Sequence, residues 1–455
     1  MKYVFKNYVV KILALLFILS SNAYAQESPP NIIFFLTDDQ GWDHHSVPMF
    51  EDEPSTNNGY FKTPNIERIA NSGMRFSNAY AAAPMCNPSR RSLHVGQSIT
   101  QVLFTGKSER EQAAALTIGE MMQTAGYQTA HFGKWSPGPS ESGLDYYNVT
   151  DGRLGNAAGN QNDPDDPKQI FGITDRAIDF MQESVAAGEP FYMQISHFAP
   201  HTGPEALQET LQAWRESASA RRRNIEISAM TQDLDTGVGM VLDELEKLGV
   251  DNNTYVFYTS DHGQTTRILN HDPLTSGKGT LWEGGIRVPF IVSGPGIEQG
   301  SISHERVVSI DLFPTFANLA NVDQALPSEI EGGDLLPVLQ GLEQGKVDRG
   351  REELIFHFPS GSGQADFRPM SAIYLGDYKM VKLYDTDEKM LFNITEDLGE
   401  KDNLAKELPA KVDEMDALLV SYFDEMGVTD FGSSARGDQG NRPAGNQRNR
   451  QGRNN

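Results

Sequence analysis

Cysteine is almost absent from this chain, which has Cys86 alone among 455 residues. A lone thiol excludes a disulfide within the chain, and an odd cysteine in a protein that leaves the cytosol is worth attention. A single cysteine more commonly packs as a small buried hydrophobe. Here Pro88 and residues 89–93 predict the first turn of a helix, because proline is favoured near a helix start. A helix N-terminus beside Arg90 and Arg91 suits anions, so we interpret Cys86 as a residue with a chemical role.

Long hydrophobic runs are also absent after the first 25 residues. Three lysines precede an apolar run at 12–19, which is followed by Ala23-Tyr24-Ala25. This order predicts a secretory signal peptide that is cut after Ala25. No later stretch is apolar for long enough to cross a bilayer, and no cysteine stands at the cleavage site for lipid attachment. We therefore expect an exported, periplasmic or secreted protein without membrane insertion.

Basic residues are scarce relative to acidic ones. The chain has 38 Lys and Arg against 62 Asp and Glu, which gives a formal net charge of −24. Such a surface repels nucleic acids and anionic membranes in general, so we expect no nucleic-acid partner. An anionic substrate would have to be attracted locally, by a few basic groups or by a metal ion.

The strand and helix patterns predict an α/β fold. Short apolar runs with β propensity, typical of buried parallel strands, alternate with segments that carry helix signals. The expected strands are 31–36, 75–80, 127–132, 191–196, 254–259 and 288–292. The expected fold is a large mixed, mostly parallel sheet flanked by helices, with a smaller C-terminal antiparallel sheet plus a helix.

The composition changes after about residue 345, where short strands with tight turns predict an antiparallel meander followed by a helix at 409–426. The last residues are Gly, Asn, Gln and Arg with almost nothing apolar, which is typical of disorder. We divide the chain into a signal peptide at 1–25, a catalytic α/β domain at 26–345, a smaller α+β domain at 346–432, and a disordered tail at 433–455.

Polar groups that suit catalysis or metal binding follow the ends of several predicted strands. They are Asp38 and Asp39, Lys134, His197 and His201, and Asp261 and His262. Each motif alone is commonly a solvated loop, but ligands of open α/β sheets bind at the carboxyl ends of strands. Paired carboxylates there suit a hard divalent cation. The glycine-rich loop 276–285 would bring Lys278 close to the same ligand.

Laid together, these segments resemble the formylglycine-dependent, arylsulfatase-like sulfatases of the alkaline-phosphatase superfamily. The matching stretches are Thr37-Asp-Asp-Gln-Gly41, Cys86-Asn-Pro-Ser-Arg90 with Gly96, Gly133-Lys-Trp135, Ala199-Pro-His201, Ser260-Asp-His-Gly263 and Gly277-Lys-Gly-Thr280 with Glu283-Gly-Gly-Ile-Arg-Val-Pro289. The likeness runs from about residue 30 to 405, and it implies an alkaline-phosphatase-like fold. The Cys-x-Pro-Ser-Arg core is specific, and the other motifs gain weight from their order.

The resemblance implies that a maturation enzyme oxidises Cys86 to formylglycine (3-oxoalanine), whose hydrated aldehyde attacks sulfur and later expels sulfate. Arg90 would hold that hydrate, and Lys134 and Lys278 would neutralise the sulfate oxygens. His201 would protonate the departing oxygen. The implied catalytic residues are Cys86, Arg90, Lys134, His201 and Lys278.

The resemblance also implies one calcium ion per chain. The implied metal ligands are Asp38, Asp39, Asp261, His262 and the modified Cys86. The family commonly has Asn or Gln at the position of His262, which is a softer ligand than calcium prefers.

One residue departs from the family pattern. Ser136 stands where the family commonly has a second histidine, in Gly-Lys-Trp-His, that acts in the release of sulfate. Serine is a poor base, so either His131, His197 or a water molecule replaces that histidine, or turnover is slow.

The expected substrate is a sulfated carbohydrate, such as an oligosaccharide derived from a polysaccharide. Candidate substrate-binding residues are His44, His45, Arg91, His197, Arg267 and His271. Two alternatives remain open: a phosphatase or phosphonate monoester hydrolase of the same superfamily, and an inactive homologue that binds sulfated glycans.

Overall fold

The computed structural model describes residues 29–51, 60–105, 115–134, 148–149, 163–217, 224–267, 272–342, 345–359 and 367–432. The predicted signal peptide and disordered tail, Ser136 and His271 lie outside these residues. No helix among the described residues is long and apolar enough to cross a membrane.

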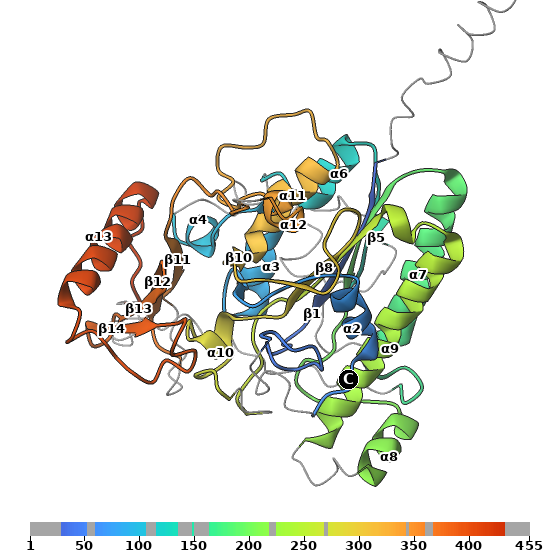
Figure 1. Ribbon diagram of the computed structural model, residues 1–455, viewed down its shortest axis with the longest axis horizontal. Coiled ribbons are helices and arrows are strands. Elements are labelled where there is room, and N and C mark those ends of the chain that lie inside the picture. The colour runs from blue at the N-terminus through green and yellow to red at the C-terminus, as the bar shows by residue number, and fades with distance from the viewer. Residues whose placement is uncertain are drawn as a thin grey trace, which may run out of the picture.

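An eight-stranded sheet with the order β5-β4-β6-β1-β7-β8-β2-β9 forms the centre of the molecule (Figure 1). Its strands are β1 (Asn31–Thr37), β2 (Gly73–Phe76), β4 (Gln128–Gly133), β5 (Asn148–Val149), β6 (Phe191–Ser196), β7 (Thr254–Ser260), β8 (Phe290–Ser293) and β9 (Ser301–Ser303). The five strands from β5 to β7 are parallel to one another, and β8 is antiparallel to both β7 and β2. The predicted mixed, mostly parallel sheet is therefore confirmed.

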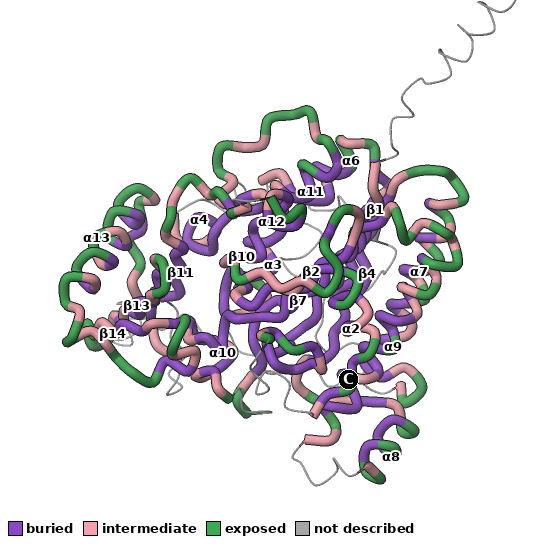
Figure 2. Tube along the Cα trace, viewed as in Figure 1, coloured by how far each residue is buried: buried purple, intermediate pink, exposed green. Residues whose placement is uncertain are grey.

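The central strand β1 is buried on both faces because its side chains alternate between two helical layers. Ile33 and Phe35 point into one core with side chains from α2 (Pro64–Asn71), α7 (Ile170–Ala187) and α9 (Ile225–Leu248). Phe34 points into the other core, where the partners come from α3 (Cys86–Val95), α6 (Ile118–Thr124), α11 (Leu312–Leu319) and α12 (Leu336–Leu339). Figure 2 shows the buried strands between these two layers. The remaining helices of this unit are α4 (Ile99–Leu103), α8 (Gln208–Glu216) and α10 (Glu283–Ile286).

The second sheet is an antiparallel meander of β11 (Leu354–Phe358), β12 (Met370–Leu375), β13 (Tyr378–Leu383) and β14 (Glu388–Asn393). Helix α13 (Pro409–Met426) covers one face of it, at the left of Figure 1. The other face packs against Tyr80, Ile286 and Val308 of the large unit. The smaller sheet plus helix is confirmed, whereas the boundary at residue 345 stays a prediction.

One local expectation needed correction. The strand predicted at 75–80 is interrupted at Ser77 and Asn78, and its second half, β3 (Ala79–Tyr80), pairs with β10 (Val307–Val308) in a separate two-stranded sheet. Gly73 is the first residue of β2, where a Cβ would lie 2.0 Å from the carbonyl oxygen of Val292. The glycine is needed there for a close approach of two strands.

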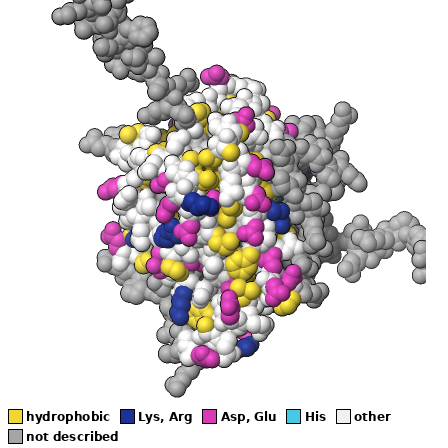
Figure 3. All heavy atoms as spheres, turned by 90° about the vertical axis from the view of Figure 1, so that its right-hand side faces the viewer, with side chains coloured by type: hydrophobic (Ala, Val, Ile, Leu, Met, Phe, Trp, Pro, Cys, Tyr) yellow, Lys and Arg dark blue, Asp and Glu magenta, His cyan; other side chains and the backbone are white. Residues whose placement is uncertain are grey.

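The acidic composition is visible on the surface that carries α7 and α9. Asp and Glu side chains are spread over this face, and Lys and Arg form only small, separate groups (Figure 3). No continuous basic surface is presented on this side of the described chain.

Candidate active site

The parallel register brings the polar strand ends together at one edge of the large sheet. Thr37, the last residue of β1, is level with Ser260 of β7, and Gly133 of β4 is level with Ser196 of β6. The residues that follow these four strands are therefore neighbours in space. Asp38 and Asp39 come from β1, Asp261 and His262 from β7, Lys134 from β4, and His201 from the loop after β6.

Cys86 lies at the first position of α3, with its side chain directed at this edge. Its Sγ lies 3.0 Å from Nε2 of His262 and 3.4 Å from Nζ of Lys278. The same Sγ lies 3.6 Å from Oδ1 of Asp38 and 3.7 Å from Oδ1 of Asp39. The thiol is thus surrounded by two carboxylates, an imidazole and an ammonium group.

Each buried carboxylate of the site is paired with one cationic side chain. Lys134 Nζ donates to Asp38 at 2.6 Å, and Lys278 Nζ donates to Asp39 at 2.7 Å. Asp261 accepts from Nε of the fully buried Arg90 at 2.8 Å. Arg90 also donates to the carbonyl oxygen of Lys134 at 3.2 Å, so it ties three of the converging segments together.

The pKa values of the site follow from burial and from this crowd of charges. Burial, followed by Asp261 and Asp38, raises the pKa of the Cys86 thiol. Burial raises the pKa of Asp39 to about 6, against the opposing charge of His262. Because a thiol with a raised pKa stays neutral, the unmodified Cys86 is a weak nucleophile.

Four of the five predicted metal ligands form a compact set. One donor atom from each of Asp38, Asp39, Cys86 and His262 lies within 4.8 Å of the others. Nδ1 of His262 lies 2.9 Å from the carbonyl oxygen of Gly263. When Nδ1 donates there, the lone pair of Nε2 is free to bind a cation beside Asp38 and Asp39. A backbone acceptor of this kind is typical of metal-binding histidines. The donors therefore fit a divalent cation.

Asp261, the fifth predicted ligand, lies at the margin of this set. Its Oδ1 is 3.5 Å from Nε2 of His262 and accepts from the backbone N–H of Asp39 at 3.1 Å, while its Oδ2 is occupied by Arg90. Asp39 itself has a φ of 64°, a left-handed conformation that aspartate tolerates better than most residues. The turn after β1 is thus held by the carboxylate of the turn after β7.

His201 lies on the open side of the cluster. Its Nε2 is 3.8 Å from Oδ2 of Asp39, and 19% of its side chain is exposed. Burial lowers its pKa. The buried Lys168, which the sequence analysis missed, donates to the carbonyl oxygen of Thr202 at 3.2 Å and so holds the segment that follows His201. No motif distinguishes this lysine from the polar residues around it.

The histidines proposed to bind substrate are placed inside the protein. His44 and His45 have no exposed surface, and His44 stacks on Phe61 with ring centroids 5.1 Å apart. Nδ1 of His45 accepts from the backbone N–H of Val47 at 3.1 Å, and burial lowers the pKa of His45 to about 4. His197 is 1% exposed and contacts Thr174. These positions favour a structural role over the expected contact with substrate.

The remaining candidates are divided between the surface and the core. Arg91 is partly buried and Arg267 is exposed, so both remain accessible to a ligand. His131, one of the residues expected to replace the missing histidine, is buried with Nε2 3.1 Å from Ser196 Oγ. Burial holds the pKa of His131 well below its usual value, with His94 and Arg90 adding to the effect.

The loop that carries Lys278 is anchored to the second sheet by a buried network of charges that the sequence analysis also missed. Glu283 accepts from Lys379 at 2.9 Å and from Arg287 at 2.6 Å. Lys379 also pairs with Glu400 at 2.7 Å, and Glu400 accepts from the backbone N–H of Glu283. Lys379 and Glu400 lie far from Glu283 and Arg287 in the sequence, so spacing alone gives no signal of the network.

This geometry is typical of one class of protein: a hydrolase with paired carboxylates that fit a metal ion and basic groups that fit an anionic ester. The sulfatase family profile matches residues 30–322, and a profile described as N-sulphoglucosamine sulphohydrolase, C-terminal, matches residues 276–424. The chain belongs to the sulfatase family. It is an enzyme that hydrolyses sulfuric ester bonds.

Two sulfatase sequences and one crystal structure are similar to this chain over most of its length. A sulfatase of Formosa agariphila is 28% identical, with 84% of this chain and 85% of the relative covered. The N-acetylgalactosamine-6-sulfatase of Mus musculus is 29% identical, with 81% and 75% covered. The crystal structure of Ps i-CgsB in complex with k-i-k-neocarrahexaose has a TM-score of 0.72 and 25% identity, with 87% of this chain and 93% of that chain covered.

Proposed function

We propose that the enzyme removes sulfate from a sulfated carbohydrate, using a formylglycine made from Cys86. The observation that carries the proposal is the position of Sγ, at the centre of the carboxylates, His262 and Lys278. Similarity to an N-acetylgalactosamine-6-sulfatase and to a protein bound to a carrageenan hexasaccharide supports a carbohydrate substrate. Formylglycine would supply a hydrated aldehyde oxygen as nucleophile where Sγ now lies.

The basic side chains bind and polarise the sulfate group. The ammonium groups of Lys134 and Lys278 both lie in the cluster, where Lys134 pairs with Asp38 and Lys278 pairs with Asp39. Positive charges held at fixed positions stabilise the charge that develops on the nonbridging oxygens as the ester bond breaks. Arg90 holds Asp261 and supports residue 86 from the same helix, one turn further along.

His201 is the proposed general acid. It lies at the partly exposed side of the cluster, where the carbohydrate part of the ester would leave. A sugar alkoxide is a poor leaving group, so protonation of its oxygen lowers the barrier. The imidazole would carry this proton on Nε2, the ring nitrogen that faces Asp39.

We further propose that the metal is calcium, one ion per chain, held by Asp38, Asp39, His262 and residue 86, with Asp261 at the margin. A divalent cation supplies Lewis-acid polarisation of a sulfate oxygen. The carboxylates suit calcium, and His262 also suits transition metals. Metal analysis of the purified protein distinguishes the two.

The site also implies a partner and a compartment. A formylglycine-generating maturation enzyme must act on Cys86, and the predicted signal peptide indicates export to the periplasm or beyond. Extracellular polysaccharide fragments are therefore the proposed source of substrate.

The test is sulfate release, measured by ion chromatography, from defined sulfated oligosaccharides of algal and animal origin. We expect release from at least one carbohydrate, an aldehyde at position 86 in mass spectra of the tryptic peptide, and no release by C86A. Nitrophenyl sulfate should be cleaved faster than nitrophenyl phosphate. If the aldehyde is present and no carbohydrate loses sulfate, the carbohydrate substrate is wrong. Faster cleavage of the phosphate would favour the phosphatase alternative.

A further inference from the structure

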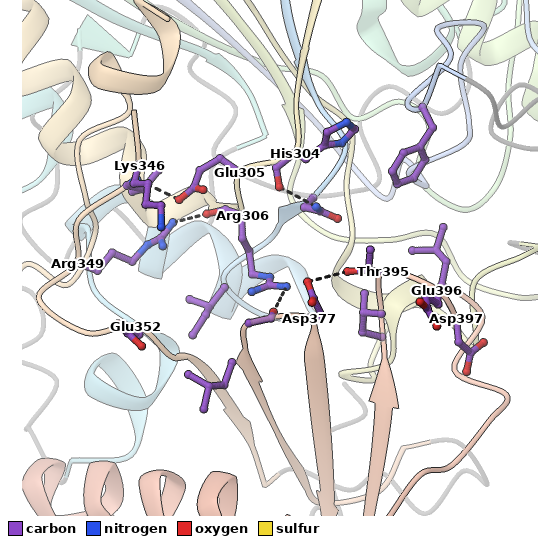
Figure 4. A pocket seen from close by; sticks show the side chains of 18 of the residues that line it. His304, Glu305, Arg306, Lys346, Arg349, Glu352, Asp377, Thr395, Glu396 and Asp397 are labelled. Carbon is purple, nitrogen blue, oxygen red and sulfur yellow. Dashed lines mark hydrogen bonds between the residues drawn. The ribbon is translucent and has the colours of Figure 1, made fainter. Parts of the chain in front are cut away.

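A large cavity lies between the large unit and the second sheet, apart from the catalytic cluster. It has a volume of about 1430 Å³, and we call it the inter-sheet groove (Figure 4). Its walls are Phe50 and Asn78, residues 304–306, 346–352, 354 and 375–377, and residues 394–399 and 401 with Pro273. The proposed catalytic residues are not among the described residues that line it. It is therefore a separate candidate for ligand binding.

Two loops connect the inter-sheet groove with the active site. The loop after β1 runs from Asp39 in the cluster to Phe50 in the groove wall, and the loop before α10 runs from Pro273 to Lys278. Oγ1 of Thr275 donates to the carbonyl oxygen of Gly399 at 2.5 Å, which fixes the second loop to the groove wall. The wall of the groove and the catalytic cluster thus share two loops.

A pair of stacked rings forms a flat, ordered part of the wall. The rings of Phe50 and His304 have centroids 5.9 Å apart and an interplanar angle of 18°. Trp42 supports Phe50 from beneath in an edge contact at 5.7 Å. Nδ1 of His304 lies 2.8 Å from Oγ of Ser77, and Asn78 donates to the His304 carbonyl oxygen at 2.8 Å. Rings fixed in this way suit a ligand with apolar faces and polar edges, such as a sugar ring.

The guanidinium groups of the groove are already occupied by protein acceptors. Arg349 makes two contacts with Asp311, at 2.8 and 2.5 Å. Arg351 pairs with Glu425 at 3.2 Å, and Arg306 donates to the carbonyl oxygen of Gly376 at 3.1 Å, as Figure 4 shows. The charges of Arg349 and Arg351 are balanced by carboxylates, whereas Arg306 donates to a neutral carbonyl oxygen and keeps its charge.

The carboxylates of the groove favour an uncharged ligand over a sulfated one. The acidic side chains of the lining are Glu305, Asp348, Glu352, Asp377, Glu396 and Asp397. Among the described residues, the cations of the lining without a carboxylate contact are Lys346, Lys401 and Arg306, against six carboxylates. Sugar hydroxyls donate to carboxylates and accept from ammonium groups, whereas a sulfate group only accepts. A sulfate group would meet repulsion there.

We propose that the inter-sheet groove binds uncharged sugar residues of the same carbohydrate whose sulfate is removed at residue 86. This inference rests on the proposed function, since it assumes a carbohydrate substrate. It gives the enzyme a preference for oligosaccharides in which unsulfated residues flank the sulfated one. The stacked pair of Phe50 and His304 is the main contact, and the carboxylates of the groove accept hydrogen bonds from the sugar hydroxyls.

The first test is isothermal titration of the full chain with four neutral hexasaccharides, built of galactose, glucose, mannose or N-acetylglucosamine. We expect at least one to bind, and we expect F50A to weaken that binding about tenfold, while F50W, which keeps a ring, retains it. If none of the four binds, or if F50A binds as tightly as the wild type, the inference is wrong. If F50A folds poorly, the binding affinity of H304A is compared with that of the wild type instead, because the side chain of His304 is exposed.

The second test uses kinetics on a sulfated oligosaccharide that the wild type cleaves. F50A and H304A should raise KM for this substrate about tenfold with unchanged kcat, and should leave nitrophenyl sulfate hydrolysis unchanged. Equal effects on both substrates, or none on either, would overturn the inference. If the wild type cleaves no carbohydrate, the proposed function fails, and the titration alone decides whether the groove binds sugars.

Discussion

Sγ of Cys86 lies 3.0 Å from Nε2 of His262, although the two residues come from a helix start and a strand end that are 176 positions apart. This contact places the residue to be modified directly beside a candidate metal ligand. The reacting group and the cation site are therefore parts of one cluster, and a change to either should alter the other.

Metal removal should lower both stability and activity. A cation that binds only the folded protein stabilises it by about 2.7 kcal/mol at one hundred times its dissociation constant. Dialysis against a chelator should lower the Tm and abolish turnover, and calcium should restore both. H262N, which supplies an amide oxygen, should retain calcium, whereas H262A should bind it at least tenfold more weakly by metal analysis. A chelated protein with unchanged Tm and turnover would exclude a functional metal.

Loss of Lys278 should affect the chemical step. Its ammonium group touches both Asp39 and Cys86, so K278A removes one positive charge from the sulfate site. We expect kcat on nitrophenyl sulfate to fall by about 100- to 1000-fold. K247A is the matched control, since Lys247 is 69% exposed on α9 and pairs with Glu244. A fall of less than tenfold for K278A would argue against its catalytic role.

Loss of His201 should depend on the leaving group. A sugar oxygen needs protonation as it leaves, whereas nitrophenolate leaves readily without it. H201A should therefore lower kcat on a sulfated sugar by about 100-fold or more, and should lower kcat on nitrophenyl sulfate far less. Comparing the two substrates with one variant cancels any effect on folding. Equal losses on both substrates would remove His201 from the role of general acid.

Acid should destabilise the protein partly through His357. This side chain is buried between Ser371 Oγ and the carbonyl oxygen of Asp430, each 2.8 Å from one ring nitrogen. Burial lowers the pKa of His357 to about 4, below the ordinary value near 6.5. The stability that its neutral form contributes is complete above pH 6.5 and is lost as pH falls towards 4.

The full loss from this histidine corresponds to about 3 kcal/mol. Chemical denaturation at pH 7 and pH 4.5 should show that H357Q loses less stability over this interval than the wild type. Parallel losses in the two proteins would show that His357 does not titrate as inferred.

The second sheet should be required for a folded active site. K379M leaves Glu283 and Glu400 buried without their shared ammonium group, and breaking a buried pair in this way costs about 3–5 kcal/mol. We expect K379M to lower the Tm and K382M, on a partly exposed position of the same strand, to change it little. The double variant K379M/E400Q, which leaves Glu283 paired with Arg287, should recover part of the loss. No difference between K379M and K382M would contradict the role of the network.

The sequence predicted which residues come together where those residues follow the ends of neighbouring parallel strands. Asp38, Asp39, Asp261 and His262 follow parallel strands, so strand recognition was enough to bring them together. The position of Cys86 at a helix start was also evident from Pro88. The histidine residue type does not itself indicate burial, however, which is why contact with substrate was expected for His44 and His45. Contacts between the two sheets depend on how the layers dock, and no local pattern indicates that docking.

The network of Glu283, Lys379 and Glu400 has a consequence for recombination between sulfatases. A crossover placed between the two sheets would separate Glu283 and Arg287 from Lys379 and Glu400, which arrive with the second segment. Because Glu283 and Arg287 balance each other, the interior of a chimaera would remain charge-balanced only if the incoming segment carried a cation at 379 and an acid at 400 together, or neither of them. Exchange of C-terminal halves is thus restricted to relatives that have both of these charges or neither, even where the exposed surfaces differ completely.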